Sequence, residues 1–287
     1  MKNFRAYFLL FIAVVALCSC DLAKNNKALI SEAGKALVEE LDQKDGEAGA
    51  CHASAGAAEA DDKLVMQTSP KGTPEQILER TGYVASYNKA TLLPNWVAWH
   101  LTAERTEGSA KRSGVDFAED TEVPEPRATD WDYYNSGYDR GHMCPAADNK
   151  WSKKAMEESF LFTNMCPQNG NLNRGDWNEM EMACRKWAKK YGDLYIVCGP
   201  ILYKGKHKTI GKNKVVVPEA FFKVVLRTGD DPQAIGFIYK NTSGNRPKDS
   251  YVNTVDEVER ITGIDFFPSL PDDVEKKVEA ECDLGLW

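Results

Sequence analysis

Four consecutive residues, Asp139-Arg140-Gly141-His142, place a carboxylate, a guanidinium and an imidazole within one short segment. An imidazole has an ordinary pKa of about 6.5, so it can accept a proton from water near neutral pH. A guanidinium pairs well with phosphate oxygens because its N–H donors lie in one plane. The segment therefore predicts phosphodiester hydrolysis with His142 as the general base and a rate that rises with pH near neutrality, although Asp139 and Arg140 can also form a simple surface ion pair.

A second polar cluster follows in the segment TNMCPQNGNLNRGDWNEMEMACR, which contains Asn164, Asn173, Glu181 and Arg185. The last three fall on a helix predicted over residues 173–191. Asn173 starts that helix, where it can be the N-cap, but its amide oxygen can also bind Mg²⁺, which needs few protein ligands. Glu181 and Arg185 are four residues apart, so they can form a helix salt bridge or face a hydrated cation and a phosphate.

The surrounding segments predict the elements that position these residues. Alternating and β-branched runs predict strands at residues 83–87, 96–101, 138–143, 160–165, 194–198, 220–226 and 234–239. Helical patterns predict helices at residues 152–159, 173–191, 254–263 and 272–281, the third with a capping box that starts at Thr254. Residues 103–137 are polar and predict a long surface excursion. Strands and helices without βαβ regularity predict an α+β fold.

The N-terminal segment is typical of a targeting sequence. Lys2 and Arg5 precede an apolar run over residues 6–17, which is too short for a comfortable membrane span and ends in Leu-Cys-Ser-Cys at Cys20. We interpret residues 1–19 as a lipoprotein signal peptide with Cys20 as the lipidated residue, although a plain secretory signal also fits. The expected protein is exported and anchored through its lipid to the membrane of a bacterial envelope, in the periplasm or at the cell surface.

The rest of the chain divides by composition. Residues 20–74 are rich in Ala, Gly and acidic residues and predict a flexible acidic tether, because so few apolar residues cannot offset the entropy of ordering. Residues 75–287 then form the functional domain. Cysteines at 51, 144, 166, 184, 198 and 282 remain beyond the leader, and some of them are expected to pair in an oxidising compartment. The spacing of His142, Cys144 and Cys166 matches no familiar zinc pattern.

Charge is distributed unevenly along the 287 residues. The net charge of −7 argues at first against a polyanionic partner. Residues 139–214, however, hold 14 Lys and Arg against 8 Asp and Glu, whereas residues 255–287 hold 3 against 10. A basic surface attracts phosphates without reading base sequence. The region with the candidate site is therefore suited to nucleic acid, although single lysines there can be solvated surface residues only.

Three motifs together resemble the DNA/RNA non-specific endonuclease family, the ββα-metal nucleases with a DRGH motif. They are DRGH at 139–142, TNxxPQ at 163–168 and LNxGxWxxxExxxR at 172–185. Segments similar to others of that family are NWVAWH at 95–100, VCGP at 197–200 and LPDDV at 270–274, so the similarity spans roughly residues 83–280. The resemblance implies a central antiparallel sheet flanked by helices, with a ββα-metal element that holds the active site.

The resemblance also implies a role for each candidate residue. It implies Mg²⁺, or Mn²⁺ or another divalent cation, bound by Asn173, with Glu181 orienting the water shell of the cation. His142 is the implied general base, while Asn164 and Asp139 hold the site in shape. The arginines implied to offset phosphate charge are Arg112, Arg140 and Arg185, of which Arg112 is similar in position to a family arginine that contacts phosphate.

The expected function is a metal-dependent endonuclease that hydrolyses DNA and RNA with little sequence specificity and leaves 5′-phosphate ends. Attack by external water needs no 2′-hydroxyl, so both nucleic acids are suitable substrates. The expected partners are DNA, RNA and, through the lipid anchor, a membrane; no protein partner is evident. One alternative is a non-catalytic nucleic-acid-binding surface lipoprotein, which needs neither His142 nor Asn173, and another is a phosphodiesterase that acts on a different polyanion.

Overall fold

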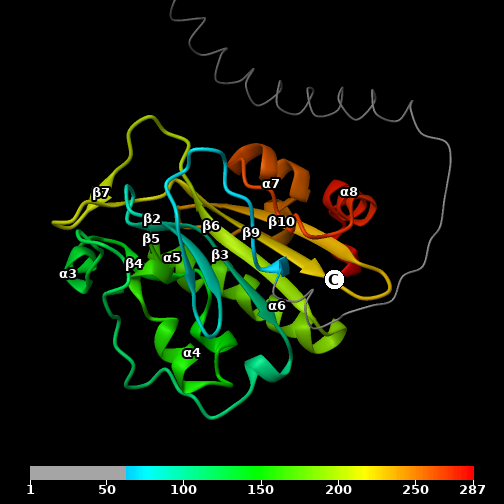
Figure 1. Ribbon diagram of the computed structural model, residues 1–287, viewed down its shortest axis with the longest axis horizontal. Helices are drawn as coiled ribbons and strands as arrows, with labels where there is room; N and C mark the ends of the chain where they lie inside the picture. Colours follow the sequence, from blue (N-terminus) through cyan, green and yellow to red (C-terminus); the bar gives the residue numbers. More distant parts are fainter. Residues whose placement is uncertain (1–62) are drawn as a thin grey trace, which may run out of the picture. The chain divides into compact units, whose positions relative to one another are not determined.

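A seven-stranded antiparallel sheet crosses the part of the chain that the structure describes, residues 63–287 of a computed structural model (Figure 1). In sheet order its strands are β1 (Gln76–Glu79), β2 (Val84–Asn88), β3 (Leu93–Leu101), β6 (Leu194–Ile201), β9 (Ala220–Arg227), β10 (Gln233–Lys240) and β11 (Val252–Asn253). The four central strands are almost fully buried, which explains their nearly continuous apolar sequences. The α+β fold with a central antiparallel sheet is thus confirmed.

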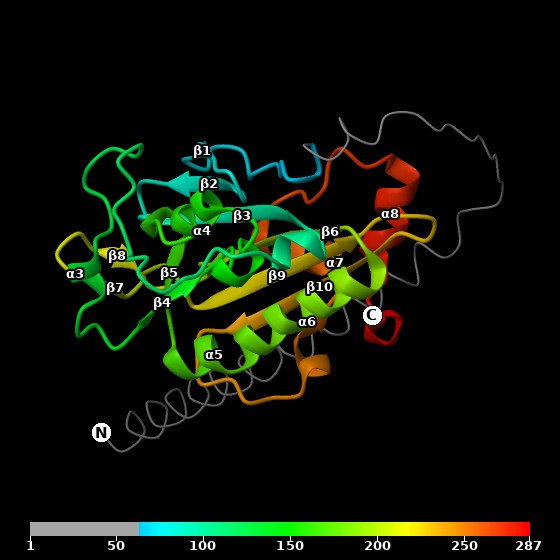
Figure 2. The same ribbon diagram turned by 90° about the horizontal axis from the view of Figure 1, so that it is seen from below.

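Helices cover the two faces of this sheet separately (Figure 2). One face carries α5 (Gly170–Arg174), α6 (Asp176–Tyr191) and a two-stranded ribbon of β4 (Asp139–His142) and β5 (Met165–Gln168). The other face carries α7 (Val255–Thr262) and α8 (Asp272–Ala280). Strand β9 shows the alternation directly, since Phe221 packs under α6 and the next residue, Phe222, packs on the side of α7.

Shorter elements lie around the edge of the sheet. They are α3 (Asp130–Tyr133), α4 (Lys153–Glu158), β7 (Thr209–Ile210), β8 (Val215–Val216) and the 3-10 turns η1 (Glu104–Thr106), η2 (Ala146–Asp148), η3 (Phe162–Asn164), η4 (Lys248–Tyr251) and η5 (Leu284–Leu286). Strands β7 and β8 pair as a small hairpin that is separate from the main sheet. The predicted strand at residues 160–165 is instead η3 followed by β5, because polar side chains of η3 bind neighbouring loops and keep the segment out of a ladder.

The helix predicted at residues 173–191 is two helices separated at Gly175. A Cβ atom at Gly175 would approach the carbonyl oxygen of Asn171 to 2.7 Å, so only glycine fits this break. The N-cap of α5 is Asn169, whose side chain accepts hydrogen bonds from the backbone of Asn171 and Leu172. The N-cap interpretation of Asn173 is therefore wrong, and its side chain is available for another role.

The predicted capping of α7 is confirmed in its main contact. The Thr254 hydroxyl accepts a hydrogen bond from the backbone N–H of Glu257 at 3.1 Å, and the helix ends at Gly263 with a φ of 70°.

Helices α7 and α8 bring three acids together: carboxylate oxygens of Asp256, Glu259 and Glu279 lie within 4.8 Å of one another. Burial, followed by repulsion from Glu259, raises the pKa of Glu279 to about 8.

The folded domain begins before the predicted boundary at residue 75. Leu64 is buried, and the side chain of Gln67 accepts a hydrogen bond from the backbone of Phe267 at 2.8 Å. Thr68 pairs with Asp265 through both backbone groups. Residues 63–74 thus pack against the C-terminal part of the domain. The predicted signal peptide, Cys20 and most of the predicted tether lie outside the described residues.

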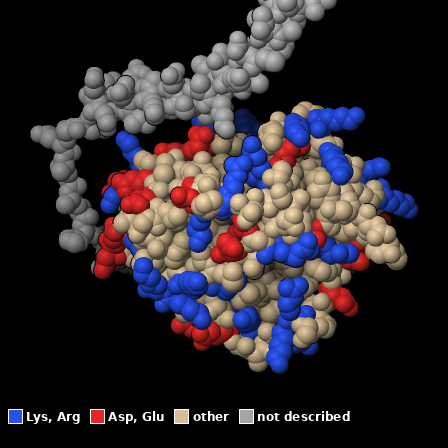
Figure 3. All heavy atoms as spheres, turned by 180° about the vertical axis from the view of Figure 1, so that it is seen from behind, with Lys and Arg blue, Asp and Glu red and all other residues tan. Residues whose placement is uncertain are grey.

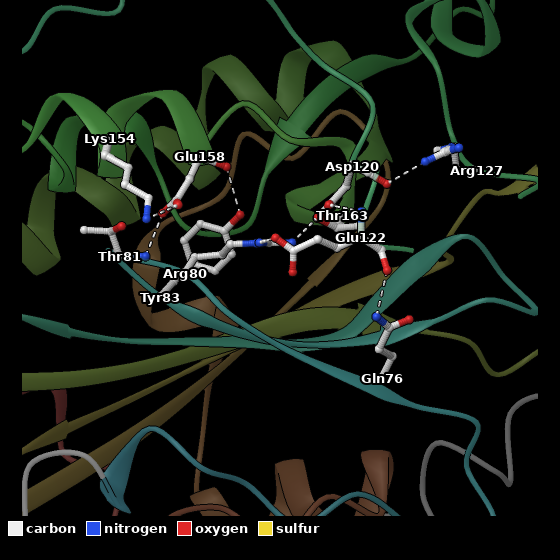
Figure 4. Close-up of polar contacts among 10 residues, drawn as sticks. All are labelled: Gln76, Arg80, Thr81, Tyr83, Asp120, Glu122, Arg127, Lys154, Glu158 and Thr163. Carbon is white, nitrogen blue, oxygen red and sulfur yellow. Dashed lines mark hydrogen bonds and ion pairs between the residues drawn. The ribbon is translucent and has the colours of Figure 1, made fainter. Parts of the chain in front are cut away.

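The long excursion before β4 is fixed by a buried acid. Asp120 is 4% exposed and accepts hydrogen bonds from Arg80 and from the Thr163 hydroxyl, both at 2.6 Å (Figure 4). Arg80 also pairs with Glu122, and Arg127 donates to the backbone oxygen of Asp120 at 3.3 Å. The excursion is therefore part of the fold, and it brings further residues over β4.

Cysteines in the described part of the chain do not pair. The five there are free, and four of them, Cys144, Cys166, Cys184 and Cys198, are buried. They pack as small apolar groups in the core, and burial raises the pKa of each thiol. The expected disulfides are thus absent from residues 63–287, while Cys51 lies outside this range.

Candidate active site

A pocket of about 860 Å³ opens where β4, α5, α6 and the excursion meet. It collects seven of the nine residues predicted from the sequence: Arg112, Asp139, Arg140, His142, Asn173, Glu181 and Arg185. Asn164 lies fully buried beneath it, and Cys20 lies outside the described residues. Strands β4 and β5 followed by α5 and α6 form the expected ββα element.

The ribbon of β4 and β5 explains the glycine in the DRGH segment. Asp139 pairs with Gln168 and His142 with Met165, so Gly141 lies opposite Cys166. A Cβ atom at Gly141 would come within 2.6 Å of the Cβ of Gln168. Glycine therefore allows the two strands to approach while the side chain of His142 lines the pocket.

The imidazole of His142 lies in an aromatic environment. The ring of Phe160 meets it edge-on at 5.0 Å between centroids, and Phe117 lies at 5.7 Å. Burial, and secondly the positive charge of Arg112, lowers the pKa of His142 to about 3. Its Nε2 atom forms no hydrogen bond within the described part of the chain. The imidazole of the free protein is thus neutral at physiological pH, whereas the expected rise of the rate near neutrality concerns the complex with substrate and stays a prediction.

Asp139 fixes the orientation of the Asn173 amide. Asn173 Nδ2 donates to Asp139 Oδ2 at 3.0 Å, and Arg174 Nη1 donates to the same oxygen at 2.9 Å. A carboxylate only accepts hydrogen bonds, so the amide nitrogen must face Asp139 and the amide oxygen must face elsewhere. This is the orientation that a cation-binding asparagine needs. Arg174 was not predicted, since an exposed arginine on a short helix gives no sequence signal of its own.

The predicted helix pair of Glu181 and Arg185 does not form. Arg185 Nη1 instead donates to Asp148 Oδ1 at 2.9 Å, and Trp99 Nε1 donates to the other oxygen of Asp148 at 3.1 Å. Glu181 is left facing the pocket, where burial, partly opposed by the charge of Lys223, raises its pKa to about 7. Asp148 was missed because its partner lies 37 residues away along the chain.

A buried lysine underlies the acids of the pocket. Lys223 on β9 is 0% exposed, and its Nζ lies 4.3 Å from the ring centroid of Trp177 and 5.0 Å from that of Trp99. Burial disfavours its charge, but Cys198, Cys184 and the acids outweigh burial and raise its pKa. The signal for Lys223 was available in the sequence, as a single charged residue within the apolar strand AFFKVVLR.

Asn164 holds the backbone beyond His142. Its side-chain oxygen accepts from the Cys144 backbone N–H at 2.9 Å, and its nitrogen donates to the backbone oxygens of Cys144 at 2.9 Å and Ser159 at 2.8 Å. Trp177 Nε1 donates to the backbone oxygen of His142 at 3.2 Å. These contacts fix the chain on both sides of the imidazole, so Asn164 is placed to shape the site from below.

The three predicted phosphate-binding arginines differ in their partners. Arg140 Nε donates to Asp130 at 2.6 Å, and Arg185 is paired with Asp148. Arg112 has its guanidinium 5.6 Å from the ring centroid of Phe160 and makes no ion pair within residues 63–287. Arg112 is therefore the arginine of the three with its charge most available to a ligand.

The donor set in the pocket fits a hydrated divalent cation. Asn173 supplies an oriented amide oxygen and Glu181 a carboxylate, and oxygen donors of this kind suit Mg²⁺ and Mn²⁺. The acidic cluster of Asp256, Glu259 and Glu279 belongs to the opposite face of the sheet and takes no part in this pocket. A neutral imidazole, an available arginine and an amide oxygen turned away from Asp139, all on a ββα element, are typical of the class of ββα-metal nucleases.

The chain belongs to the DNA/RNA non-specific endonuclease family. The sequence profile of that family matches residues 61–273, which confirms the resemblance inferred from the three motifs. Members of this family depend on a divalent metal ion. The family assignment therefore agrees with the donor set of the pocket and with the fold.

Named relatives are nucleases. Mitochondrial nuclease EXOG of Xenopus laevis is 36% identical over 218 residues, which cover 70% of this chain and 60% of that protein. Mitochondrial endonuclease G of Homo sapiens is 34% identical over 209 residues, which cover 68% of this chain and 70% of that protein. In the crystal structure titled as the EndoG/EndoGI complex, the matching chain has a TM-score of 0.66 and 31% identity, over 69% of this chain and 87% of its own. The chain thus spans less than two thirds of the frog protein.

These relatives correct the expected localisation. They are mitochondrial nucleases of animals, and this contradicts the expectation of a lipoprotein of a bacterial envelope. The prediction failed because it depended on a short apolar run and one cysteine, and leader segments of different destinations share such composition. Between residues 63 and 287, no helix combines the length and apolarity that crossing a bilayer requires.

Proposed function

We propose that this protein is an endonuclease that uses a divalent cation to hydrolyse phosphodiester bonds of DNA and RNA, with little base specificity and with 5′-phosphate products. One observation carries the proposal: a single pocket holds the neutral imidazole of His142, the available guanidinium of Arg112 and the oriented amide oxygen of Asn173. A protein that only binds nucleic acid does not need these three groups to be oriented toward one another. Nuclease relatives from animals support the same reaction class.

In the proposed reaction the imidazole of His142, which lines the pocket, accepts the proton of the attacking water. Arg112 binds the phosphate, which neutralises the charge that depresses the pKa of His142. Substrate binding thereby makes the imidazole a stronger base. Phe160 and Phe117 pack against the imidazole and hold it in one place. They also exclude bulk water from that side of the ring.

The remaining residues position these groups. Asp139 keeps the Asn173 oxygen turned away from itself, and Asn164 holds the backbone that follows His142. A divalent cation held by Asn173, with its water shell oriented by Glu181, would supply charge stabilisation at the phosphate and at the leaving 3′ oxygen. Contacts to phosphate carry no base information, which supports low sequence specificity.

A nicking assay on supercoiled plasmid and a parallel assay on RNA test the proposal. Wild type is expected to cut both substrates with Mg²⁺ or Mn²⁺ and neither in excess EDTA. The Asn173→Ala variant should lose activity by orders of magnitude without unfolding. Product ends should accept labelled phosphate from a kinase only after phosphatase treatment, because they already carry a 5′-phosphate.

Two outcomes would contradict this function. Full activity in EDTA would exclude the cation. Nucleic-acid binding by wild type without any cleavage would identify a non-catalytic binding protein. Failure to bind DNA or RNA would favour a phosphodiesterase that acts on another polyanion.

A further inference from the structure

Two large aromatic side chains, one on α3 and one on the residue that follows it, project into solvent beside the pocket. Trp131 is 79% exposed and Tyr134 is 61% exposed, and their rings meet edge-on at 5.6 Å between centroids. Tryptophan is seldom so exposed in a folded protein, because water disfavours its large apolar surface. This pair is therefore an unusual feature that the reaction proposed above does not use.

An ion pair links α3 to the pocket. Asp130, the residue before Trp131, accepts a hydrogen bond from Arg140 Nε at 2.6 Å, and Arg140 lines the pocket. The guanidinium of Arg140 also lies 5.8 Å from the ring centroid of Tyr133, within the same helix. The aromatic pair thus begins one residue from a contact with the DRGH segment.

Another set of contacts fixes α3 to the hairpin of β7 and β8. Asp132 accepts hydrogen bonds from Asn213 N and Asn213 Nδ2, each at 2.9 Å, and from the backbone of Thr129 at 2.9 Å. Gly211 has a φ of 65°, and a Cβ atom there would clash with the backbone and side chain of Asp132. The hairpin therefore touches α3 closely, and Figures 1 and 2 both show the two side by side.

The segment that contains β7 and the turn of this hairpin, residues 203–214, is strongly basic. It has five lysines and no acidic residue, and each of the lysines is exposed: Lys204, Lys206, Lys208, Lys212 and Lys214. None of them forms an ion pair with another residue in the described range, although Lys208 lies 4.7 Å from the ring centroid of Tyr138. Lys and Arg side chains, drawn in blue, project along the right margin of Figure 3. This margin corresponds to the left side of Figure 1, where α3 and β7 lie, because the two views differ by 180° about the vertical axis.

We propose that Trp131, Tyr134 and the lysine segment 203–214 form a platform for single-stranded nucleic acid next to the active site, a proposal that rests on the proposed function. Unpaired bases would stack on the two rings while the lysines contact the flanking phosphates. In a duplex the faces of the bases are already covered by their neighbours, so exposed aromatic rings favour a single strand. The adjoining positive segment matches the phosphate charge of such a strand.

Equilibrium binding in excess EDTA tests the platform without cleavage. The probes are a fluorescent oligothymidylate and a blunt duplex of the same length. Trp131→Ala should weaken binding of the single strand at least about fivefold, since stacking on an aromatic ring contributes about 1–3 kcal/mol per base. Duplex affinity should change less than about twofold, and Trp131→Phe should restore most of the lost affinity. Ile261→Ala, which removes an exposed apolar side chain from the opposite face of the sheet, is the matched control.

The lysine segment has its own measurement and its own control. Lys212→Gln combined with Lys214→Gln should lower the dependence of log affinity on log salt by about 1.4, given about 0.7 per phosphate contact on a single strand. Gly211→Ala should weaken single-strand binding because it forces the segment away from α3. Gly205→Ala is the control within the same segment, since a Cβ atom at Gly205 meets no other atom within 4 Å.

The results separate the platform from the proposed function. If wild type cleaves and binds but Trp131→Ala binds the single strand normally, the platform is wrong and the nuclease stands. An equal loss for single strand and duplex would also overturn stacking, because it indicates a general effect on the pocket. If wild type neither binds nor cleaves nucleic acid, both proposals fall together.

Discussion

The low pKa of His142 makes a prediction about the pH dependence of catalysis. Burial among aromatic rings, and secondly the charge of Arg112, lowers this pKa to about 3. His142 is then almost fully neutral at every pH above about 5 in the free enzyme. Its contribution to kcat/KM, which reports on the free enzyme, should therefore be the same throughout this range.

The perturbation is His142→Ala, and the quantity of interest is the ratio of wild-type to variant kcat/KM. General-base catalysis is typically worth about 10²–10⁴-fold, so the ratio should fall in that range. A histidine with an ordinary pKa of about 6.5 would lose roughly tenfold of its neutral form between about pH 8 and about pH 5.5. For such a histidine the ratio would shrink by that amount toward acid, whereas the structure predicts a constant ratio.

Initial rates of plasmid nicking at several pH values between about 5.5 and 8 give this ratio. Titration of other groups, including Glu181 with its pKa of about 7, affects both proteins and cancels. NMR titration of the His142 ring protons in the free protein supplies an independent check. A ratio that falls about tenfold by pH 5.5, or an NMR midpoint for His142 above about 6, would refute the argument from burial.

Three further predictions concern charged side chains. Asp148→Asn leaves Arg185 without its partner, and loss of one member of a buried pair typically costs about 3–5 kcal/mol, so thermal unfolding should move to a clearly lower Tm. Glu279 has a folded pKa of about 8 against an ordinary 4.5, so its contribution to stability is present below about pH 4.5 and is lost as pH rises from there through about 8; Glu279→Gln should therefore raise Tm at about pH 9 by a few degrees and change little at about pH 4. Arg112→Ala should weaken substrate binding and raise the pKa of His142 measured by NMR, and an unchanged pKa would mean that burial alone sets it.

Local sequence patterns predicted most of the fold. Strands β3, β6, β9 and β10 and the two C-terminal helices appeared within a few residues of their observed bounds, because periodicity and capping residues such as Thr254 act over short distances. The break at Gly175 was missed because one glycine within a helical pattern is also compatible with a continuous helix. The early start of the domain was missed because Leu64 and Gln67 are stabilised by residues about 200 positions away.

The site was predictable in its residue types and less so in its pairings. The DRGH segment and the helices after it supplied six of the seven predicted residues that line the pocket, since each motif fixes its own local geometry. The partners of Arg140 and Arg185 come from other segments, so no spacing rule identified Asp130 or Asp148. The pKa of His142 depends on aromatic rings that only the folded chain brings together, and it could not be read from neighbouring residues.

The buried lysine beneath the pocket has a consequence for how this sequence can vary. Two cations, Lys223 and Arg185, face two acids, Asp148 and Glu181, so the floor of the pocket is electroneutral when Glu181 is ionised. Removing one charge leaves another uncompensated in a low-dielectric interior, whereas removing a cation and an acid together does not. Substitutions at these four positions should therefore be epistatic: Lys223→Met combined with Glu181→Gln should fold better than Lys223→Met alone, although it is inactive. We therefore expect these four positions to covary among relatives.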